Sequence, residues 1–368
     1  MRVQKRGQEI KIKTISGEIA IKRTYYYCRE CGNGECPYDE EIGIDKLPHK
    51  ITKEMMLESA YYGQNQSSFK DASHLIKRAM GMEINAETIR EVTEMVGRKT
   101  FEKDEERSKE TLSNIQKIDT TRQKEGTLYI EIDGAAVNTR VEDKNGSTWR
   151  ENKTVMVFTD KDMIKRADES HIITKKEYAA YIGSSEEFKA FVLDVAVRAG
   201  YGNIRNVVLI GDGAAWIRTM CEEIFPYAVQ ILDLYHLKEN IYTYAKHKFG
   251  GDAGKYTPFA ETIIKKIEDG KIGEVLDSLP NDEKLPSGIV NLKTYISNNR
   301  DKINYSAYRK NGWFVGSGAI ESANKLIVQR RLKQAGMRWS VEGAQALLTL
   351  RAKVESNLWT SVVSDFIA

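Results

Sequence analysis

The stretch Val207-Val208-Leu209-Ile210-Gly211-Asp212-Gly213 decides how the rest of the chain is interpreted. A run of four apolar residues closed by glycine predicts a buried strand. Asp212 then follows the carboxyl end of that strand, which is where open α/β sheets place their chemistry. The glycines on either side lack a Cβ, so a substrate backbone or a metal ion can approach the carboxylate closely.

Two further predicted strands also end in a carboxylate. Residues 128–132 (Leu-Tyr-Ile-Glu-Ile) lead into Asp133, and residues 228–232 (Ala-Val-Gln-Ile-Leu) lead into Asp233. A single aspartate at a strand end is often only a turn residue or a helix cap. Three of them in one chain favour a carboxylate cluster.

The charge is distributed unevenly along a composition that is ordinary for a globular protein. Of 368 residues, 30% are charged and 41% are hydrophobic, and the net charge is +3. Residues 1–23 hold seven basic and two acidic residues, and residues 321–353 hold the same numbers, so the middle of the chain is acidic. Basic ends around an acidic middle suit a nucleic-acid-binding protein with a metal site, although uneven surface charge alone gives the same pattern.

The sequence shows no membrane or secretion signal. No apolar segment approaches the roughly 18–20 residues that span a membrane, and no apolar signal region follows Met1. Four cysteines, three of them clustered, argue against a disulfide scaffold. We therefore expect a cytoplasmic protein.

The clustered cysteines follow a predicted β-hairpin over residues 9–27. Cys28 and Cys31 come directly after the hairpin, and Cys36 lies five residues further on. This spacing is typical of a zinc knuckle, because two thiolates so placed can bind one tetrahedral ion. A closed site needs four ligands. His49 is a candidate for the fourth, and three free cysteines without metal are the alternative.

A helical region follows. Residues 51–80 predict two helices, the second closed by Gly81, and Asn85 caps a third. Two helices around a Gly-Met-Glu turn resemble a helix-turn-helix, whose second helix would enter the major groove, although any small helical bundle gives this pattern. Residues 99–125 predict a solvated helix or linker, with a domain boundary near residue 124.

The block after residue 124 predicts strands and helices in alternation. Residues 154–158 and 171–173 predict two strands after the first, and a Ser184–Glu187 capping box begins a helix. Three meandering strands, a helix, a strand, a helix and a strand are the element order of a ribonuclease-H-like fold.

An all-helical insertion is predicted over residues 237–310, with Pro258 at the first position of one helix. After it, Ser317 is a candidate cap for a helix that carries Glu321 and runs to about Gln334. A final helix follows Ser340.

Asp133, Asp212 and Glu321 form the candidate metal-binding set. Two strand-end aspartates and a helical glutamate can hold two divalent ions about 3.5–4 Å apart. Hard oxygen ligands suit Mg²⁺ or Mn²⁺, which keep open positions for substrate phosphates. A glutamate near a helix start often serves only the helix dipole. His236 is a candidate proton donor or phosphate contact, or else a packed histidine that opens a helix.

Four segments resemble the Kra group of bacterial insertion-sequence transposases, which are DDE enzymes with a ribonuclease-H-like core. They are Gly211-Asp-Gly-Ala-Ala-Trp216, Asp233-Leu-Tyr-His236, Gly316-Ser-Gly-Ala-Ile-Glu321 and Gln329-Arg-Arg-Leu-Lys-Gln-Ala-Gly-Met-Arg-Trp339. The resemblance covers nearly the whole chain.

The resemblance implies Asp133, Asp212 and Glu321 as the metal-binding triad, with His236 closing an Asp-x-x-His motif. It implies double-stranded DNA as the partner, at the terminal inverted repeats of the element and at the target. We also expect a homo-oligomer assembled on that DNA and association with the nucleoid. Family members carry an upstream helical segment and a first Cys-x-x-Cys, so we expect a chain shortened at its start, with an incomplete zinc site.

The basic residues after Glu321 are predicted to contact DNA. Phosphate contacts are predicted for Lys325, Arg330, Arg331, Lys333 and Arg338. Trp313 and Trp339 are candidates for stacking on unpaired bases. Trp216 and Tyr235 are predicted to be core aromatics.

The predicted function is DNA strand cleavage and strand transfer at the ends of an insertion sequence. The expected architecture mixes α+β and α/β features: a hairpin with a cysteine knuckle (1–50), a helix-turn-helix-like region and linker (51–124), and a ribonuclease-H-like domain with a helical insertion (125–368). Another ribonuclease-H-like nuclease, such as a resolvase or an RNA–DNA hybrid hydrolase, is one alternative. A non-catalytic DNA-binding remnant is the other.

Overall fold

The chain forms two units that alternate along the sequence. The computed structural model describes residues 1–121, 123–166, 171–281 and 285–367. Unit 1 comprises Met1–Asp104, Val137–Arg150 and Leu326–Ala368, and unit 2 comprises Glu105–Ala136 and Glu151–Lys325. Each unit is therefore completed by segments that lie far apart in the sequence.

Unit 1 begins with an antiparallel sheet of three strands. The strands are β1 (Arg2–Thr14), β2 (Gly17–Tyr27) and β3 (Gly34–Glu35), in that order. Ile12 pairs with Ile19 and Ile10 with Ile21, and Gly17 has the positive φ of 129° that the tight connection requires. The predicted hairpin is confirmed. A short helix, α1 (Pro37–Glu41), follows β3.

Helices form the rest of unit 1. They are α2 (Lys53–Asn65), α3 (Phe69–Met80), the amino-terminal part of α4 (Ala86–Ser113), α14 (Val341–Glu355) and α15 (Trp359–Ile367). The predicted caps are confirmed: Gly81 ends α3 with a φ of 68°, and Asn85 Oδ1 accepts from the Thr88 backbone at 2.7 Å. The polar stretch after residue 98, predicted as a solvated helix or linker, continues α4 to Ser113.

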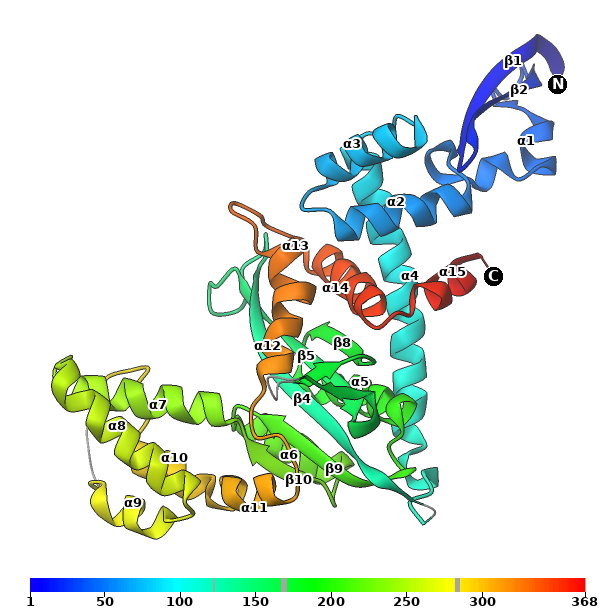
Figure 1. Ribbon diagram of the computed structural model, residues 1–368. Helices are drawn as coiled ribbons and strands as arrows, with labels where there is room; N and C mark the ends of the chain where they lie inside the picture. Colours follow the sequence, from blue (N-terminus) through cyan, green and yellow to red (C-terminus); the bar gives the residue numbers. More distant parts are fainter. Residues whose placement is uncertain (122, 167–170, 282–284, 368) are drawn as a thin grey trace. The chain divides into compact units, whose positions relative to one another are not determined.

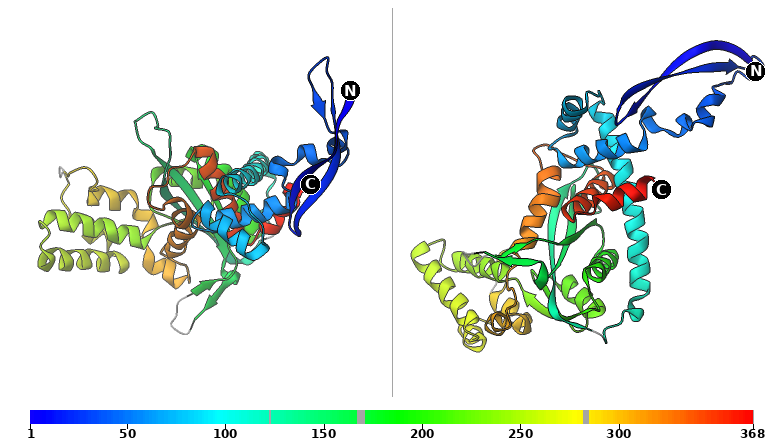
Figure 2. Two further views of the ribbon diagram at one scale, coloured as in Figure 1. Left: turned by 90° about the horizontal axis from the view of Figure 1, so that it is seen from above. Right: turned by 45° about the vertical axis from the view of Figure 1, so that its right-hand side comes forward.

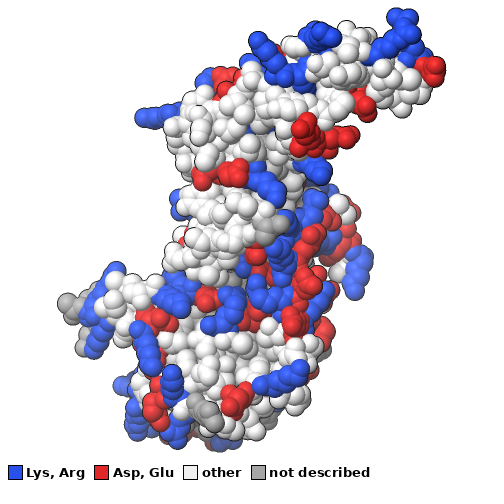
Figure 3. All heavy atoms as spheres, turned by 90° about the vertical axis from the view of Figure 1, so that its right-hand side faces the viewer, with Lys and Arg blue, Asp and Glu red and all other residues white. Residues whose placement is uncertain are grey.

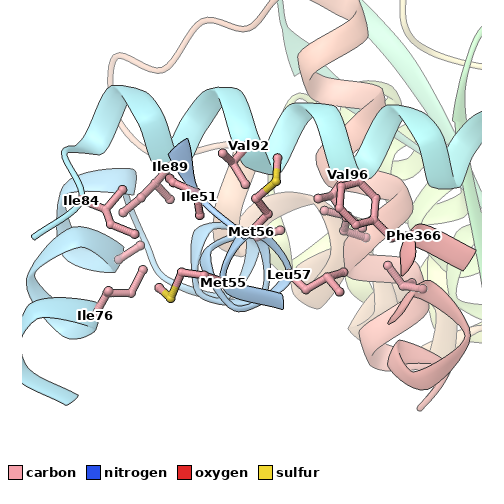
Figure 4. Close-up of a cluster of buried hydrophobic side chains, with 14 of the residues drawn as sticks. Ile51, Met55, Met56, Leu57, Ile76, Ile84, Ile89, Val92, Val96 and Phe366 are labelled. Atoms are coloured by element: carbon pink, nitrogen blue, oxygen red, sulfur yellow. The ribbon is translucent and has the colours of Figure 1, made fainter. Parts of the chain in front are cut away.

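The core of unit 1 lies where these helices meet. Figure 4 shows Met55 and Met56 from α2, Ile76 from α3, Val96 from α4 and Phe366 from α15 converging on one cluster. All but Phe366 are at most 1% exposed. Burial of large apolar side chains contributes about 1.5–3 kcal/mol each, so this cluster holds the helices together.

Unit 2 is built on a mixed sheet of five strands. The strands are β4 (Lys124–Asn138), β5 (Trp149–Thr159), β8 (Glu177–Ile182), β9 (Ile204–Gly211) and β10 (Val229–Leu232). Their order is β10-β9-β4-β5-β8, with β4, β9 and β10 parallel and β5 antiparallel to β8. Helix α5 (Ser185–Ala199) packs against β8 and against α6 (Ala215–Ile224) (Figure 1).

Two strand predictions in this sheet are wrong. β7 (His171–Ile173) pairs with β6 (Met163–Lys165) in a separate two-stranded sheet, and β8 completes the main sheet instead. The first strand also does not end before Asp133, because β4 continues through Gly134 to Asn138. Val137 in this extension is fully buried.

The predicted helical stretch is confirmed. It contains α7 (Leu234–Lys248), α8 (Ala253–Glu268), α9 (Ile272–Ser278), α10 (Leu292–Asn298) and α11 (Tyr305–Lys310), which stand beside the sheet (Figure 2). Pro258 lies inside α8 rather than at its start, because Asp252 is the cap and its Oδ1 accepts from the Gly254 backbone at 3.0 Å. Tyr305 Oη donates to the Leu232 carbonyl at 2.9 Å and ties this group to β10.

The last helical stretch is irregular. α12 (Gly318–Asn324) passes into a π-helical turn (Lys325–Gln329) and then α13 (Arg330–Leu332). Ser317 is not a side-chain cap, since its buried Oγ has no hydrogen-bond partner. Ser340 does cap α14, accepting from the Gly343 backbone at 3.0 Å, but the chain then forms α15 as well.

Figure 3 shows the charged side chains on one face of the protein. On the face drawn in Figure 3, basic and acidic side chains are interspersed. Across the described ranges, no helix has the length and apolarity needed to cross a membrane.

Candidate active site

Asp212 lies directly after β9, as predicted. β9 runs parallel to β4 on one side and to β10 on the other, so the carboxyl ends of three strands share one edge of the sheet. Asp212 Oδ1 accepts from the Ala214 backbone at 2.8 Å, and Gly213 between them has a φ of 86°. This turn leaves the carboxylate half-buried at the edge.

Asp133 reaches the same edge from β4. It stands two residues beyond Glu131, which is the last residue of β4 paired with β9. Its Oδ1 accepts from the Gly134 backbone at 2.8 Å, and its Oδ2 accepts from Asn324 Nδ2 at 2.6 Å. Asn324 is 3% exposed and belongs to α12, so a hydrogen bond connects the strand to the helix that carries Glu321.

Burial, hydrogen bonds and nearby charged groups all shift the pKa of the Asp133 carboxyl. Burial raises this pKa above its ordinary value, and the nearby Asp212 carboxylate raises it further. The hydrogen bonds from Gly134 and Asn324 and the neighbouring His236 lower it. Asp133, Asp212 and His236 therefore belong to one electrostatic cluster.

Glu131 is a member of the site that sequence reasoning missed. Its side chain is 1% exposed, and its Oε2 accepts from the Ile320 backbone at 2.9 Å. Burial raises its pKa to about 8, and the Asp233 and Glu321 carboxylates also raise it. A charged residue inside the apolar run Leu-Tyr-Ile-Glu-Ile was the signal that could have revealed it, because glutamate is almost never fully buried unless it has a partner.

Glu321 lies in the first turn of α12 and is half-buried. It is close enough to Glu131 to raise the pKa of that carboxyl. The hydrogen bond between Glu131 and the Ile320 backbone fixes the residue next to Glu321 against β4. The start of α12 is therefore anchored at the edge that carries Asp133.

Asp233 has a structural role. It is fully buried, and its carboxylate accepts from the backbones of Tyr235 and His236 in the first turn of α7 and from Ser317 at 2.9 Å. It thus caps α7 and holds the Gly-Ser-Gly turn before α12. Three backbone donors occupy its oxygens, which makes it a poor candidate for a metal ligand.

His236 lies between carboxylates. Its Nε2 is 3.7 Å from Asp233 Oδ2, and its Nδ1 is 3.7 Å from Glu239 Oε2. The imidazole is 27% exposed, so it is accessible from solvent.

The donor chemistry of this edge suits a hard divalent cation, although the ligands are not gathered. Asp133, Asp212 and Glu321 supply carboxylate oxygens, which Mg²⁺ and Mn²⁺ prefer. Within the described ranges, no three His, Cys, Asp or Glu side chains come together closely enough to hold one ion. Both oxygens of Asp133 accept hydrogen bonds, so metal binding there would displace at least one of them.

Within the described residues, the predicted zinc ligands of unit 1 do not form a group of three that could hold a metal ion. Cys28, Cys31 and Cys36 are free, and hydrogen bonds from the Cys31 backbone and thiol lower the pKa of the Cys28 thiol. The Nε2 atom of His49, the candidate fourth ligand, lies 3.0 Å from a Glu91 carboxylate oxygen. His49 is therefore engaged elsewhere.

The predicted DNA-contacting residues divide by exposure. The side chains of Lys325, Arg330, Lys333 and Arg338 are exposed, as phosphate contacts must be. Arg331 differs from them: it is 1% exposed, and its side chain folds back onto the backbone of Gly63, so it does not lie on an open surface as the other four do.

The aromatic predictions are also corrected. Trp339 is 7% exposed and donates from Nε1 to the Leu332 carbonyl at 3.1 Å, so it cannot stack on a base. Tyr235 is 58% exposed and is not a core aromatic. Trp313 is half-buried against Tyr308, and Trp216 is half-buried against Phe188.

One known protein family matches almost the whole chain. A model of the uncharacterised protein family UPF0236 matches residues 2–363. The chain belongs to UPF0236. The match includes every carboxylate of the strand edge and both units.

Curated UPF0236 relatives come from Caldanaerobacter subterraneus subsp. tengcongensis. UPF0236 protein TTE2489 is 24% identical over 361 residues, which are 95% of this chain and 69% of the relative. A second UPF0236 protein, whose name joins eleven designations from TTE0033 to TTE2212, is also 24% identical over 361 residues and 68% of its length. This UPF0236 chain therefore spans about two thirds of these relatives.

Proposed function

We propose that this UPF0236 chain is a DDE transposase, which cleaves and joins DNA strands at the ends of an insertion sequence. One observation carries the proposal. Asp133 and Asp212 stand at the carboxyl edge of adjacent parallel strands, and α12, which bears Glu321, is hydrogen-bonded to the same edge through Asn324 and Ile320. Asp133 and Asp212 thus share one edge, and Glu321 belongs to the helix that is hydrogen-bonded to it.

The topology of unit 2 supports a ribonuclease-H-like core. The strands β4, β5 and β8 lie side by side, α5 leads from β8 to β9, and α6 leads from β9 to β10. This is the order of three strands, helix, strand, helix and strand on which the proposal rests. The helices α7 to α11 then form the insertion before α12.

Each member of the set has a proposed role. Asp133, Asp212 and Glu321 would hold Mg²⁺ or Mn²⁺, which when bound activates a water or a 3′-hydroxyl and stabilises the leaving oxygen. Asn324 positions the Asp133 carboxylate, and Glu131 and Asp233 fix the backbone on either side of the Gly-Ser-Gly turn. His236 would exchange a proton with the substrate.

The flanking charges fit a nucleic-acid substrate. Lys325 and Arg330 are exposed in the helical turns that follow Glu321. We propose that they contact phosphates together with Lys333 and Arg338. Such contacts position DNA without reading its sequence.

The name of one relative adds a further argument. It joins eleven designations for a single strain. One protein under many designations in one strain is what we expect of an element that has copied itself within a genome.

Strand nicking tests the proposal. The purified chain is incubated with Mg²⁺ and a duplex carrying the sequences that flank its gene, beside an Asp212→Asn variant and an Asp277→Asn control, whose carboxylate is exposed on α9 of the helical insertion. We expect nicking by the wild type and the control and none by Asp212→Asn. Binding without nicking by the wild type would favour a DNA-binding remnant, and cleavage of RNA–DNA hybrids alone would favour a hydrolase.

A further inference from the structure

A pocket in unit 1 lies outside the proposed active site and takes no part in its chemistry. Its volume is about 300 Å³. Four arginines line it, namely Arg90, Arg140, Arg331 and Arg338, and Glu94 is its one acidic lining residue. The arginines come from three separate segments of the chain, and the fold alone brings them together.

One arginine of this pocket is buried with an unused donor. Arg331 is 1% exposed, donates from Nε to the Gly63 carbonyl at 3.2 Å and from Nη1 to the Ser67 carbonyl at 3.4 Å. Its Nη2 is buried without a hydrogen-bond partner. A buried guanidinium nitrogen without an acceptor is costly, so this atom marks a place for an acceptor that the chain does not supply.

The charge of Arg331 is also incompletely balanced. Burial lowers the pKa of its guanidinium to about 10, and the nearby Arg351 lowers it as well, against a weaker opposing effect of Asp71. An anion bound at Nη2 would favour the charged guanidinium and so raise the pKa of Arg331 again.

The other pocket arginines differ in how far they are neutralised. Arg90 pairs with Glu94 at 2.7 Å and with Glu87 at 2.6 Å, so its charge is matched within α4. Arg140 and Arg338 are exposed, and the side chain of Arg140 donates to the Arg338 carbonyl at 3.3 Å. The excess positive charge of the pocket thus comes from Arg140, Arg331 and Arg338.

Two helix amino termini add to this positive field. Ser68 caps α3 and Ser340 caps α14, and both residues line the pocket. These helices are 12 and 15 residues long. Amino termini of helices present unpaired N–H groups and the positive end of the helix dipole, which favour phosphate.

We propose that this pocket binds a phosphate group, held by Arg331 Nη2 and by the exposed Arg140 and Arg338 side chains. The source we favour is the backbone of a DNA strand, and only that choice rests on the proposed function. The Arg331 guanidinium covers the ring of Phe69 at 4.3 Å and that of Trp339 at 5.1 Å, so neither ring is open for a base to stack on it. Since contacts to phosphate carry no sequence information, we expect binding that does not depend on DNA sequence.

Calorimetric titration tests the site in the full chain. The probes are inorganic phosphate, thymidine monophosphate and a short duplex DNA of arbitrary sequence. Arg140→Gln and Arg338→Gln change exposed side chains, so the fold should tolerate them. Arg331→Lys keeps the buried positive charge but removes the planar guanidinium group with its N–H donors. Arg78→Gln is the matched control, since Arg78 is exposed at the opposite end of α3. We expect each pocket variant to bind phosphate about tenfold or more weakly and the control to bind as the wild type does.

The outcomes separate this inference from the proposed function. Parallel losses for DNA identify the DNA backbone as the source, and losses confined to the two small probes identify a free phosphate compound instead. Unchanged phosphate affinity in Arg140→Gln and Arg338→Gln overturns the site. Asp212→Asn should bind every probe like the wild type, so failure of cleavage and failure of this pocket give different results.

Discussion

Glu131 Oε2 accepts a hydrogen bond from the Ile320 backbone at 2.9 Å, between residues that are 189 positions apart. The bond joins the centre of β4 to the first turn of α12 and so places Glu321 beside the strand edge. Without it, the start of α12 would be held only by the hydrogen bond from the Ser317 backbone to Asp233. Glu131 is therefore a positioning residue of the candidate site, together with Asp233 and Asn324.

Glu131→Gln should change how stability depends on pH. The carboxyl ionises near 4.5 in an unfolded chain, but burial raises its pKa to about 8 in the folded one. Between these values the folded state holds the extra proton, so this residue makes the free energy of unfolding fall as pH rises, by at most about 1.4 kcal/mol per pH unit. Gln keeps an acceptor for Ile320 and does not ionise. Urea unfolding from pH 5 to 9 should show a shallower decline for the variant than for the wild type, and identical slopes would contradict this assignment.

Asn324→Ala should shift the pH profile of cleavage. Its Nδ2 stabilises the ionised form of Asp133, and its loss raises the pKa of that carboxyl further. Because metal binding needs the carboxylate, the acidic limb of the profile should move to higher pH, with activity partly recovered at pH 9. Asn298→Ala, an exposed substitution at the end of α10, is the control. An equal loss at every pH would mean that Asn324 acts only on the fold.

Local patterns predicted part of this architecture well. The edge positions of Asp212 and Asp233 follow from short apolar runs that end in a carboxylate, a signal contained within a few residues. The caps Asn85 and Ser184 and the terminating Gly81 are equally local, and the structure confirms them.

The features that the sequence did not predict involve residues whose partners lie far away in the sequence. Residues 171–173 are predicted as a strand of the main sheet. In the structure β8 pairs with β5 in that sheet, and β7 pairs with β6 in a separate one. The clustering of basic residues after Glu321 predicts a phosphate contact for Arg331, and only the fold shows that Gly63 and Phe69 enclose its side chain. The same holds for Glu131, whose partner lies 189 residues away.

Arg351→Lys should destabilise unit 1. Arg351 is 1% exposed, and its Nε donates to the Leu326 and Ile327 carbonyls at 2.9 and 3.0 Å in the π-helical stretch, while Nη1 donates to the Gln64 carbonyl at 2.7 Å. Lysine cannot reproduce this fork, so we expect a loss of about 2–4 kcal/mol in the free energy of unfolding. The exposed Arg330→Lys should cost almost nothing. Equal denaturation midpoints for the two variants would show that the buried fork contributes little.

Zinc binding at the cysteines stays a prediction, and His49 is not expected to take part. His49 faces Glu91 at 3.0 Å, whereas Cys28 and Cys31 are hydrogen-bonded to each other. Competition with a chromophoric chelator should therefore give the same zinc affinity for His49→Ala and wild type, and a much lower one for Cys28→Ser and Cys31→Ser. A large loss of affinity in His49→Ala would reinstate it as the fourth ligand.

The most direct test of the central claim is Mg²⁺-dependent cleavage and strand transfer on DNA that carries the element's ends, compared among Asp133→Asn, Asp212→Asn, Glu321→Gln and their pairwise combinations. These substitutions preserve size while removing one charge each, so folding and DNA binding should persist. The account predicts a loss of several orders of magnitude for each single variant and no further loss for the pairs, because three ligands of one metal site act as a unit. Cleavage by Glu321→Gln at the wild-type rate, with Asp212→Asn inactive, would contradict it.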